Sequence, residues 1–413
     1  MQDELLRDLL MTSKDGDWGE DAPRLDLVPY RVIRGADFPA VRLGETSGIP
    51  VRYLDAKTVH RRTLLPNDII IETAGGNRDR PTGRSLFISE RLARSTDHPL
   101  TCASFCRFLR VDPKKAVPAY VFWYLQSLYA CGHMWQHQVQ HTGVARFQYT
   151  KFAESTSIPL PDSHTQSAVS DLLNALDQKI ELNRSANETL EKIAQALFKS
   201  WFVGIDDQKI QKGWSLLQLG ELCEVGRGAS PRPIQQYMGG TIPWIKIADA
   251  TAADGPFIFE TAEHVTEQGA EKSVHVLPGD LILSNSATCG LPVFADLEGF
   301  IHDGWLYFRN LRLISKLYLY HVLKEISEHL IQIADGSVQK NLNTGLVKSQ
   351  QVIVPPEHLL AVFDDAVKPM FDLIRDNGRQ SRTLAALRDI LLPKLIAGDV
   401  SLGQGESIVE AHV

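Results

Sequence analysis

Two long segments of the chain repeat apolar residues at the spacing of a coiled coil. The first segment, residues 165–202, places apolar side chains at two core positions of a heptad: Val169, Leu176, Leu190 and Leu197, then Leu173, Ile180, Ala194 and Trp201. The same pattern returns 194 residues later: Phe363, Met370, Leu384 and Leu391, then Val367, Ile374 and Leu395. Arg388 interrupts the second set. Sustained heptads with charged residues between them predict two long helices that form a coiled coil.

The ends of both helices are marked in the sequence. A short apolar strand with flanking prolines comes before each helix, at 157–161 and 351–356. Gly204 and Gly398 lie just beyond the helices, where a C-terminal cap favours glycine. A helix of 38 residues is about 57 Å long.

Asparagine occupies a core position near the middle of each predicted helix. Asn183 and its counterpart Asn377 are 194 residues apart. If the helices pair antiparallel, these residues meet in a polar layer that fixes the register. The alternative is that Asn377 and Gly378 form a turn that breaks the second helix.

Shorter matches indicate that the whole chain is an internal repeat. Two of them are offset by 193 residues: Arg34–Ala36 with Arg227–Ala229, and Ile49-Pro50 with Ile242-Pro243. Leu65–Ile71 matches Leu277–Leu283 at an offset of 212, and Tyr124-Leu125 matches Tyr318-Leu319 at 194. These matches predict 19 extra residues in the second copy before its Leu-Pro-x-Asp turn. Each copy should contain a buried strand, at 69–71 and 281–283, and a short helix, at 116–131 and 315–334.

This organisation predicts five parts and an α+β fold. The expected parts are a first mixed α/β domain with an N-terminal helix (1–161), a first long helix (162–204), a second domain (205–356), a second long helix (357–400) and a tail (401–413). The chain has 413 residues, enough for two substantial cores. Its five cysteines, an odd number, indicate reduced thiols in a cytoplasmic protein. The sequence predicts neither a secretory signal nor a membrane helix.

The net charge of −7 conceals a basic block. Residues 28–152 contain 18 basic and 9 acidic side chains, a net charge of +9, whereas residues 214–354 contain 10 and 15, a net charge of −5. A basic domain within an acidic chain favours contact with nucleic acid in the first half of the molecule.

No catalytic or metal site is predicted. Gly76–Ser85 has the wrong spacing for a phosphate-binding loop, and Asp68 and Glu72 fit a turn and a strand better than a nuclease metal site. His133, His137 and His141 are four residues apart and would share one face of a continuous helix, so zinc binding is the alternative to a polar surface.

Nucleic-acid contact has better support. The segment 131–149 mixes Gln, His, Arg and aromatic residues, and its last eight residues align with 336–343. Arg, Gln and Asn match the donors and acceptors of base edges, and other basic residues suit phosphates. The candidates in the first copy are Arg34, Arg61, Arg62, Arg78, Arg80, Arg84, Gln138, Arg146, Gln148 and Tyr149. Those in the second are Arg227, Arg232, Lys246, Ser337, Gln339, Lys340 and Asn341.

The chain resembles the specificity subunits of type I restriction–modification systems. The resemblance is carried by both helices with their lead-in strands, above all by the endings ALFKSWF (196–202) and LRDILLPKLIAGDV (387–400). The segments 226–228 and 242–244 add to it, and Leu5–Leu10 resembles Leu387–Leu392, which implies a cyclic arrangement.

The resemblance implies a non-catalytic chain with two target-recognition domains related by a pseudo-two-fold axis. Each domain would read half of a bipartite site in double-stranded DNA, and the antiparallel coiled coil would set the spacing. Two methyltransferase subunits would dock on the coiled coil, and restriction subunits would complete the complex. S-adenosylmethionine, ATP and Mg²⁺ would belong to those partners, with no cofactor in this chain. The docking residues would include Phe198, Trp201 and Phe202.

Two other functions fit the same features. One is the specificity chain of a related system whose partner fuses methylase and nuclease. The other is a coiled-coil scaffold that binds only proteins.

Overall fold

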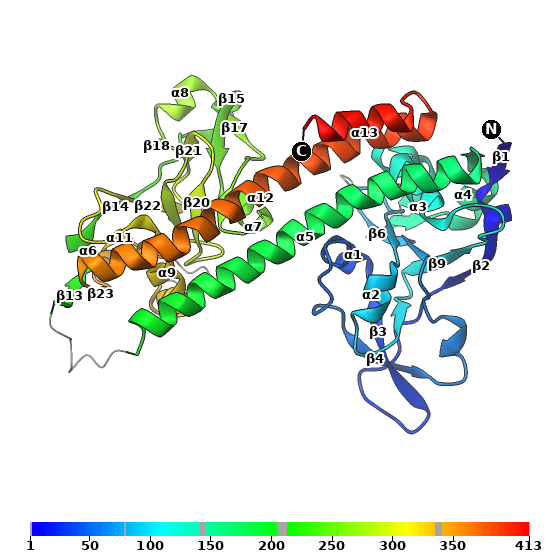
Figure 1. Ribbon diagram of the computed structural model, residues 1–413, viewed down its shortest axis with the longest axis horizontal. Coiled ribbons are helices and arrows are strands. Elements are labelled where there is room, and N and C mark those ends of the chain that lie inside the picture. Colours follow the sequence, from blue (N-terminus) through cyan, green and yellow to red (C-terminus); the bar gives the residue numbers. More distant parts are fainter. Residues whose placement is uncertain are drawn as a thin grey trace. The chain divides into compact units, whose positions relative to one another are not determined.

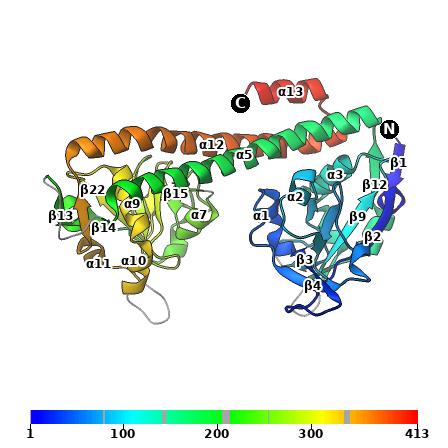
Figure 2. The ribbon, with the colours of Figure 1, turned by 60° about the horizontal axis from the view of Figure 1, so that its bottom comes forward.

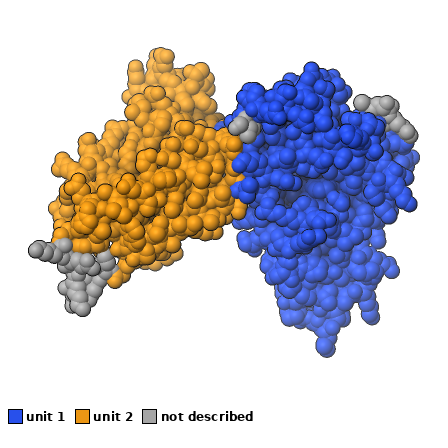
Figure 3. Space-filling view, viewed as in Figure 1, with its two compact units in different colours: residues 1–182, 381–413 blue, residues 183–380 orange. Residues whose placement is uncertain are grey.

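The computed structural model describes residues 2–77, 80–140, 145–204, 213–253, 255–334 and 341–412. These residues form two compact units (Figure 3): unit 1 comprises 1–182 and 381–413, and unit 2 comprises 183–380. Figure 1 shows the long helices α5 (Ser163–Phe202) and α12 (Glu357–Ala397), and each of them contributes residues to both units. The predicted α+β fold with two repeated domains and a long antiparallel helix pair is confirmed.

The described residues of unit 1 form three sheets in addition to the pair β1–β12. Its strands are β1 (Gln2–Leu5), β2 (Leu10–Asp15), β3 (Leu27–Ile33), β4 (Val51–Asp55), β5 (Ile69–Glu72), β6 (Ala74–Gly76), β7 (Ser85–Phe87), β8 (Leu100–Cys102), β9 (Cys106–Val111), β10 (Gln138–Gln140), β11 (Ala145–Phe147) and β12 (Ser157–Leu160). They pair in the orders β2-β9-β5-β7, β4-β3-β8, β10-β11-β6 and β1-β12. Its shorter α-helices are α1 (Phe38–Arg42), α2 (Glu90–Arg94), α3 (Pro118–Ala130), α4 (Tyr149–Ser155) and α13 (Leu402–Glu410).

Unit 2 has a similar plan. Its strands are β13 (Ser215–Gln218), β14 (Glu224–Arg227), β15 (Met238–Ile245), β16 (Phe257–Ile258), β17 (His264–Val265), β18 (Val274–Val276), β19 (Leu281–Ser284), β20 (Pro292–Ala295), β21 (Gly299–Ile301), β22 (Trp305–Arg309) and β23 (Gln351–Val354). They pair in the orders β14-β22-β19-β20-β16, β17-β15-β21-β18 and β13-β23. Its shorter α-helices are α6 (Leu219–Leu222), α7 (Ile247–Ala252), α8 (Glu267–Ala270), α9 (Lys316–Glu325), α10 (Ser327–Ile333) and α11 (Thr344–Lys348).

Strand pairing confirms the internal repeat. Ile70 of β5 lies between Leu86 and Phe108, and Ile282 of β19 lies in the same way between Val293 and Tyr307. Both strands are buried, as their apolar runs predict. The parallel pair β3–β8 has its counterpart in β15–β21. Within each unit, a helix, α3 or α9, lies between the long helices and the strands (Figure 2).

The structure corrects the alignment of the two copies upstream of β5 and β19. The equivalents of Arg34 and Ile33 are Lys246 and Ile245, at an offset of 212, because Ile33 and Ile245 end the matching parallel strands. Arg34 and Lys246 each come next, and the backbone N–H of each donates to an aspartate three residues on, at 2.8 and 2.7 Å. The recurrence of Arg-Gly-Ala at 227 is therefore incidental, and the predicted insertion of 19 residues is wrong.

Gly228 matches Gly16 instead. Each donates its N–H across the sheet, to Cys106 O at 3.0 Å and to Trp305 O at 2.8 Å. A Cβ would lie 1.9 Å from a carbonyl oxygen at Gly16 and 2.1 Å from one at Gly228. The close approach of the backbone therefore requires glycine in both copies.

Three further expectations about helices are corrected. The expected N-terminal helix is one 3₁₀ turn, Leu6–Leu9, equivalent to α6, because β1 pairs with β12 directly before it. The predicted helix at 315–334 is divided at Ile326 into α9 and α10. The counterpart of Tyr318 is Tyr120, since their hydroxyls donate to equivalent strands, at Ile353 O (2.6 Å) and Pro159 O (3.1 Å).

The asparagine layer lies in unit 2. Asn183 Nδ2 donates to Asn377 O at 3.4 Å and to Gln380 Oε1 at 2.9 Å. Asn377 Nδ2 donates to Asn187 Oδ1 at 2.9 Å, and Asn187 Nδ2 donates to Ile374 O at 3.2 Å. The helices are antiparallel here, since residue numbers rise along α5 as they fall along α12.

The second helix passes through Gly378 without a break, so the alternative of a turn at this point is wrong. A Cβ at Gly378 would lie 2.4 Å from the Phe259 ring, which explains why glycine occurs within the helix. Gly204 and Gly398 have φ values of +80° and +77°, as the predicted C-terminal caps require.

We expect Asn377→Leu to lower the free energy of unfolding by about 2 kcal/mol, because buried Asn187 loses its donor. The double variant Asn187→Leu/Asn377→Leu should recover part of this loss, since both polar partners are then removed. Urea unfolding of the full chain measures both. Simple additivity of the two single changes would contradict this role of the layer.

Candidate nucleic-acid interface

The candidate interface in unit 1 is built around the backbone of Thr73. The N–H groups of Thr73 and Ala74 donate to Phe105 O at 2.8 and 3.3 Å, and Phe147 N–H donates to Thr73 O at 2.9 Å. These bonds bring together the turn 103–106, the segment after β5, and β11. The buried ring of Phe147 anchors β11, while its neighbours Arg146 and Gln148 are exposed. Two predicted base-reading side chains therefore project from a fixed backbone.

Unit 2 repeats this framework with different side chains. Asn285 N–H donates to Gly304 O at 2.9 Å, and Leu342 N–H donates to Asn285 O at 2.8 Å. Leu342 is buried like Phe147, which makes Asn341 the equivalent of Arg146. The sequence alignment that set Lys340 opposite Arg146 is therefore wrong by one residue. Asn341 is exposed, as Arg146 is.

Arg107 and Tyr149 border the same region of unit 1. The Arg107 guanidinium lies 4.6 Å from the centre of the Tyr149 ring and holds both carboxylate oxygens of Asp15, at 2.8 and 2.7 Å. Burial raises the pKa of Tyr149, so its phenol stays protonated at neutral pH. These three residues line a shallow hollow with Gln148 and Lys151.

Two of the predicted nucleic-acid contacts, Arg84 and Arg80, are engaged within the protein. Arg84 donates to both carboxylate oxygens of buried Glu72, at 3.0 and 2.9 Å, and to Gly35 O at 2.6 Å. Arg80 reaches Glu72 at 3.3 Å. The structure gives both arginines a part in holding the segment after β5. Gln138 also binds within the protein, since its side-chain oxygen accepts from Thr82 N–H at 2.8 Å.

The other predicted contacts are distributed over both units. Arg34 pairs with Asp37 at 2.7 Å, and its equivalent Lys246 pairs with Glu263 at 2.5 Å. Arg61 is exposed, and Arg62 lies 3.4 Å from Asp17. Arg227 and Arg232 both bind Asp303, at its backbone oxygen (2.7 Å) and its carboxylate (3.3 Å). The remaining candidates lie outside the described residues: Arg78, Ser337, Gln339 and Lys340.

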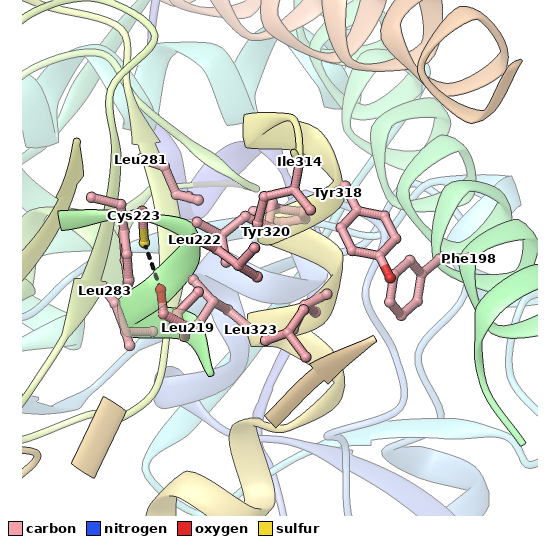
Figure 4. Close-up of a cluster of buried hydrophobic side chains, with 14 of the residues drawn as sticks. Phe198, Leu219, Leu222, Cys223, Leu281, Leu283, Ile314, Tyr318, Tyr320 and Leu323 are labelled. Carbon is pink, nitrogen blue, oxygen red and sulfur yellow. Dashed lines mark hydrogen bonds between the residues drawn. The ribbon is translucent and has the colours of Figure 1, made fainter. Parts of the chain in front are cut away.

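The residues predicted to dock a partner separate into two kinds. Phe198 and Phe202 are each only 3% exposed, and Phe198 lies in the core of unit 2 beside Tyr318 (Figure 4). Their role is to pack α5 against α9 and α12, which corrects the expectation that they contact a partner directly. Trp201 is 36% exposed, so part of its side chain remains accessible.

The alternative metal site finds no support in the described residues. His133 and His137 lie in a 3₁₀ helix that ends at His137, so they do not share the face of an α-helix, and His141 falls outside the described residues. Asp68 accepts from Leu65 N–H at 2.7 Å and pairs with Arg110, which is the predicted turn role. Within the described ranges, no three His, Cys, Asp or Glu side chains gather as metal ligands, and no helix has the length and apolar character to cross a membrane.

Sequence reasoning missed Phe105 and Arg107. Their signal is weak, because Phe105 is a single aromatic residue in a short turn and Arg107 is one of many arginines in the basic block. Only the hydrogen bonds to Thr73 reveal that this turn adjoins β11.

Comparison with known proteins finds a family model that matches part of this chain. Residues 211–358 match the model of the type I restriction modification DNA specificity domain. This part of the chain is therefore similar to that family's domain. The MjaIX specificity subunit of a type I restriction enzyme from Methanocaldococcus jannaschii is 25% identical over 317 residues, 71% of this chain and 72% of the relative. The HindI specificity subunit from Haemophilus influenzae is 25% identical over 320 residues, 60% of this chain and 69% of the relative.

A solved structure extends the likeness to nearly the whole fold. The crystal structure of a type I restriction–modification S subunit from M. genitalium superimposes with a TM-score of 0.58 at 16% identity, covering 95% of each chain. The resemblance seen in the sequence is thus confirmed, and both units share the fold of a specificity subunit.

Proposed function

We propose that this chain is the non-catalytic DNA-specificity subunit of a type I restriction–modification complex. The main support is the equivalence of Arg146 in unit 1 and Asn341 in unit 2. Each is exposed, follows the same framework and precedes a buried anchor, yet the two side chains differ. Side chains that vary on a constant backbone are what two recognition domains with different half-sites would need.

The long helices would set the distance between the two half-sites. At 1.5 Å per residue, a helix of 40 residues, the length of α5, extends about 60 Å. This is close to two turns of duplex DNA, each about 34 Å. The site would therefore be bipartite, with an unread spacer between its halves.

Partner subunits would complete the complex. Methyltransferase subunits would dock on the outer faces of the helices, where Leu182, Ile193, Val362, Leu373 and Ile390 are between 44% and 57% exposed. S-adenosylmethionine, ATP and Mg²⁺ would be bound by the methyltransferase and restriction subunits. The net charge of −5 in residues 214–354 implies that the chain alone binds DNA weakly and that its partners supply further phosphate contacts.

We expect Arg146→Ala to weaken discrimination at the first half-site by about 2 kcal/mol, the range of a bidentate base contact. Asn341→Ala should act on the second half-site only. Binding of the reconstituted complex to duplexes with one altered half-site measures both effects. Equal loss on all DNA, with a lower salt slope, would make Arg146 a phosphate contact instead. Absence of salt-dependent DNA binding by the wild-type complex would favour a protein scaffold and refute the proposal.

A further inference from the structure

An exposed phenylalanine, Phe105, belongs to the candidate interface of unit 1. Phe105 is 64% exposed, an unusual position for a large aromatic side chain. Its backbone is nonetheless fixed. The turn is closed by Cys106 N–H to Ala103 O at 2.8 Å, and Phe105 O accepts from both Thr73 and Ala74. The ring is therefore presented to solvent by a rigid turn.

The surroundings of this turn suit DNA. Thr73, which binds the backbone of Phe105, also binds that of Phe147, so the turn adjoins the exposed side chains Arg146 and Gln148. Arg107 follows two residues later. The surrounding block, residues 28–152, has a net charge of +9. DNA matches this combination of an exposed ring and basic side chains, because it carries negative phosphates and has apolar groups in its grooves.

The repeat shows that the fold does not need an aromatic residue at this position. The equivalent of Phe105 is Gly304, whose carbonyl accepts from Asn285 as that of Phe105 accepts from Thr73. In unit 2 the imidazole of His302 covers the turn, since Gly304 N–H donates to His302 Nδ1 at 2.6 Å. A Cβ on Gly304 would lie 2.0 Å from His302 Cε1. The two turns share a backbone, and only that of unit 1 offers an apolar surface.

We propose that Phe105 contacts the 5-methyl group of a thymine in the half-site read by unit 1, and that unit 2 makes no such contact from Gly304. Thymine alone presents an apolar group in the major groove, and a phenylalanine ring is a suitable partner for it. The proposal deepens the proposed function and rests on it, since it names a residue that would set sequence preference in one of the two domains.

The test uses the full chain with its methyltransferase partner and a duplex that carries the mapped recognition site. Each thymine of the first half-site is replaced in turn by deoxyuridine, which lacks only the methyl group. One replacement should weaken wild-type binding about fourfold, the effect of one buried methyl group. Phe105→Ala should weaken binding to the thymine duplex about tenfold and should no longer distinguish deoxyuridine at that position. Binding to a duplex without the site should be unchanged.

The control variant is Met11→Ala. Met11 is also 64% exposed in unit 1, but it lies at the opposite end of the β2–β9 pairing from Phe105, so its loss should leave all duplexes unaffected. Wild-type affinity in Phe105→Ala, retained sensitivity to deoxyuridine, or a first half-site without an A·T pair would each overturn the inference while leaving the proposed function intact. A wild-type complex that binds all duplexes equally would overturn both.

Discussion

Replacing Glu72 with alanine is expected to lower the free energy of unfolding of unit 1 by about 3 kcal/mol, as breaking a buried ion pair does. The Glu72 side chain is 3% exposed and its partner Arg84 19%, so the variant leaves a largely buried guanidinium without its carboxylate. Glu72 also fills the space beside Gly35, where a Cβ would lie 2.5 Å from its Oε1. Urea unfolding of the full chain measures the loss.

Glu90→Ala is the matched control. Glu90 pairs with Arg94 in the same unit, but the two side chains are 68% and 80% exposed, and an exposed pair contributes about 0.5 kcal/mol. The loss of unfolding free energy in Glu72→Gln should fall between those of Glu72→Ala and Glu90→Ala, because glutamine keeps the shape of the side chain and one acceptor. If Glu72→Ala were no more destabilising than Glu90→Ala, the buried pair would not hold the segment after β5.

Acidification is expected to destabilise unit 2 through His321. Burial, followed by the nearby charge of Lys324, lowers the pKa of His321 from 6.5 to about 3. The folded protein therefore keeps this imidazole neutral, while the unfolded chain takes up a proton below pH 6.5. The stabilisation is fully present above pH 6.5 and is lost progressively as the pH falls towards 3. At pH 5 the loss amounts to about 2 kcal/mol.

The packing of His321 explains this shift. Its Nδ1 donates to Gln195 Oε1 at 2.7 Å. The ring centres of Phe198, Phe363 and Phe371 lie within 5.6 Å of the centre of the imidazole ring. His321→Asn retains a donor near the position of Nδ1 but has no titrating group. The variant should lose less stability between pH 7 and pH 5 than the wild type. Identical losses would assign the acid sensitivity to other groups, of which His302 is one, since burial also lowers its pKa.

Features with a strong local period could be predicted from the sequence. The heptads located both long helices to within two residues at their starts, and the glycines beyond them adopt the positive φ of a cap. The apolar runs at Ile69 and Leu281 are buried strands, as predicted. In these segments local preference and tertiary burial agree, so the pattern is sufficient.

Features that depend on pairing between distant segments could not be predicted. The short match at Arg227 suggested the wrong alignment, because strand partners rather than residue types decide that Lys246 is the counterpart of Arg34. Arg84 was predicted to contact nucleic acid, and only the fold shows that Glu72 holds it. Phe105 was missed for the same reason, since its turn lies beside two segments that are distant in the sequence, residues 73–74 and β11.

Mapping of modified bases by long-read sequencing, in a host that expresses this chain with its methyltransferase partner, tests the central claim most directly. The wild-type chain should produce one motif of two short half-sites separated by an unread spacer of fixed length. A chain that lacks seven residues from each long helix should produce the same half-sites with a shorter spacer, because one heptad shortens each helix by about 10 Å without changing its phase. A single continuous motif, or a spacer that stays the same after the deletion, would contradict the account.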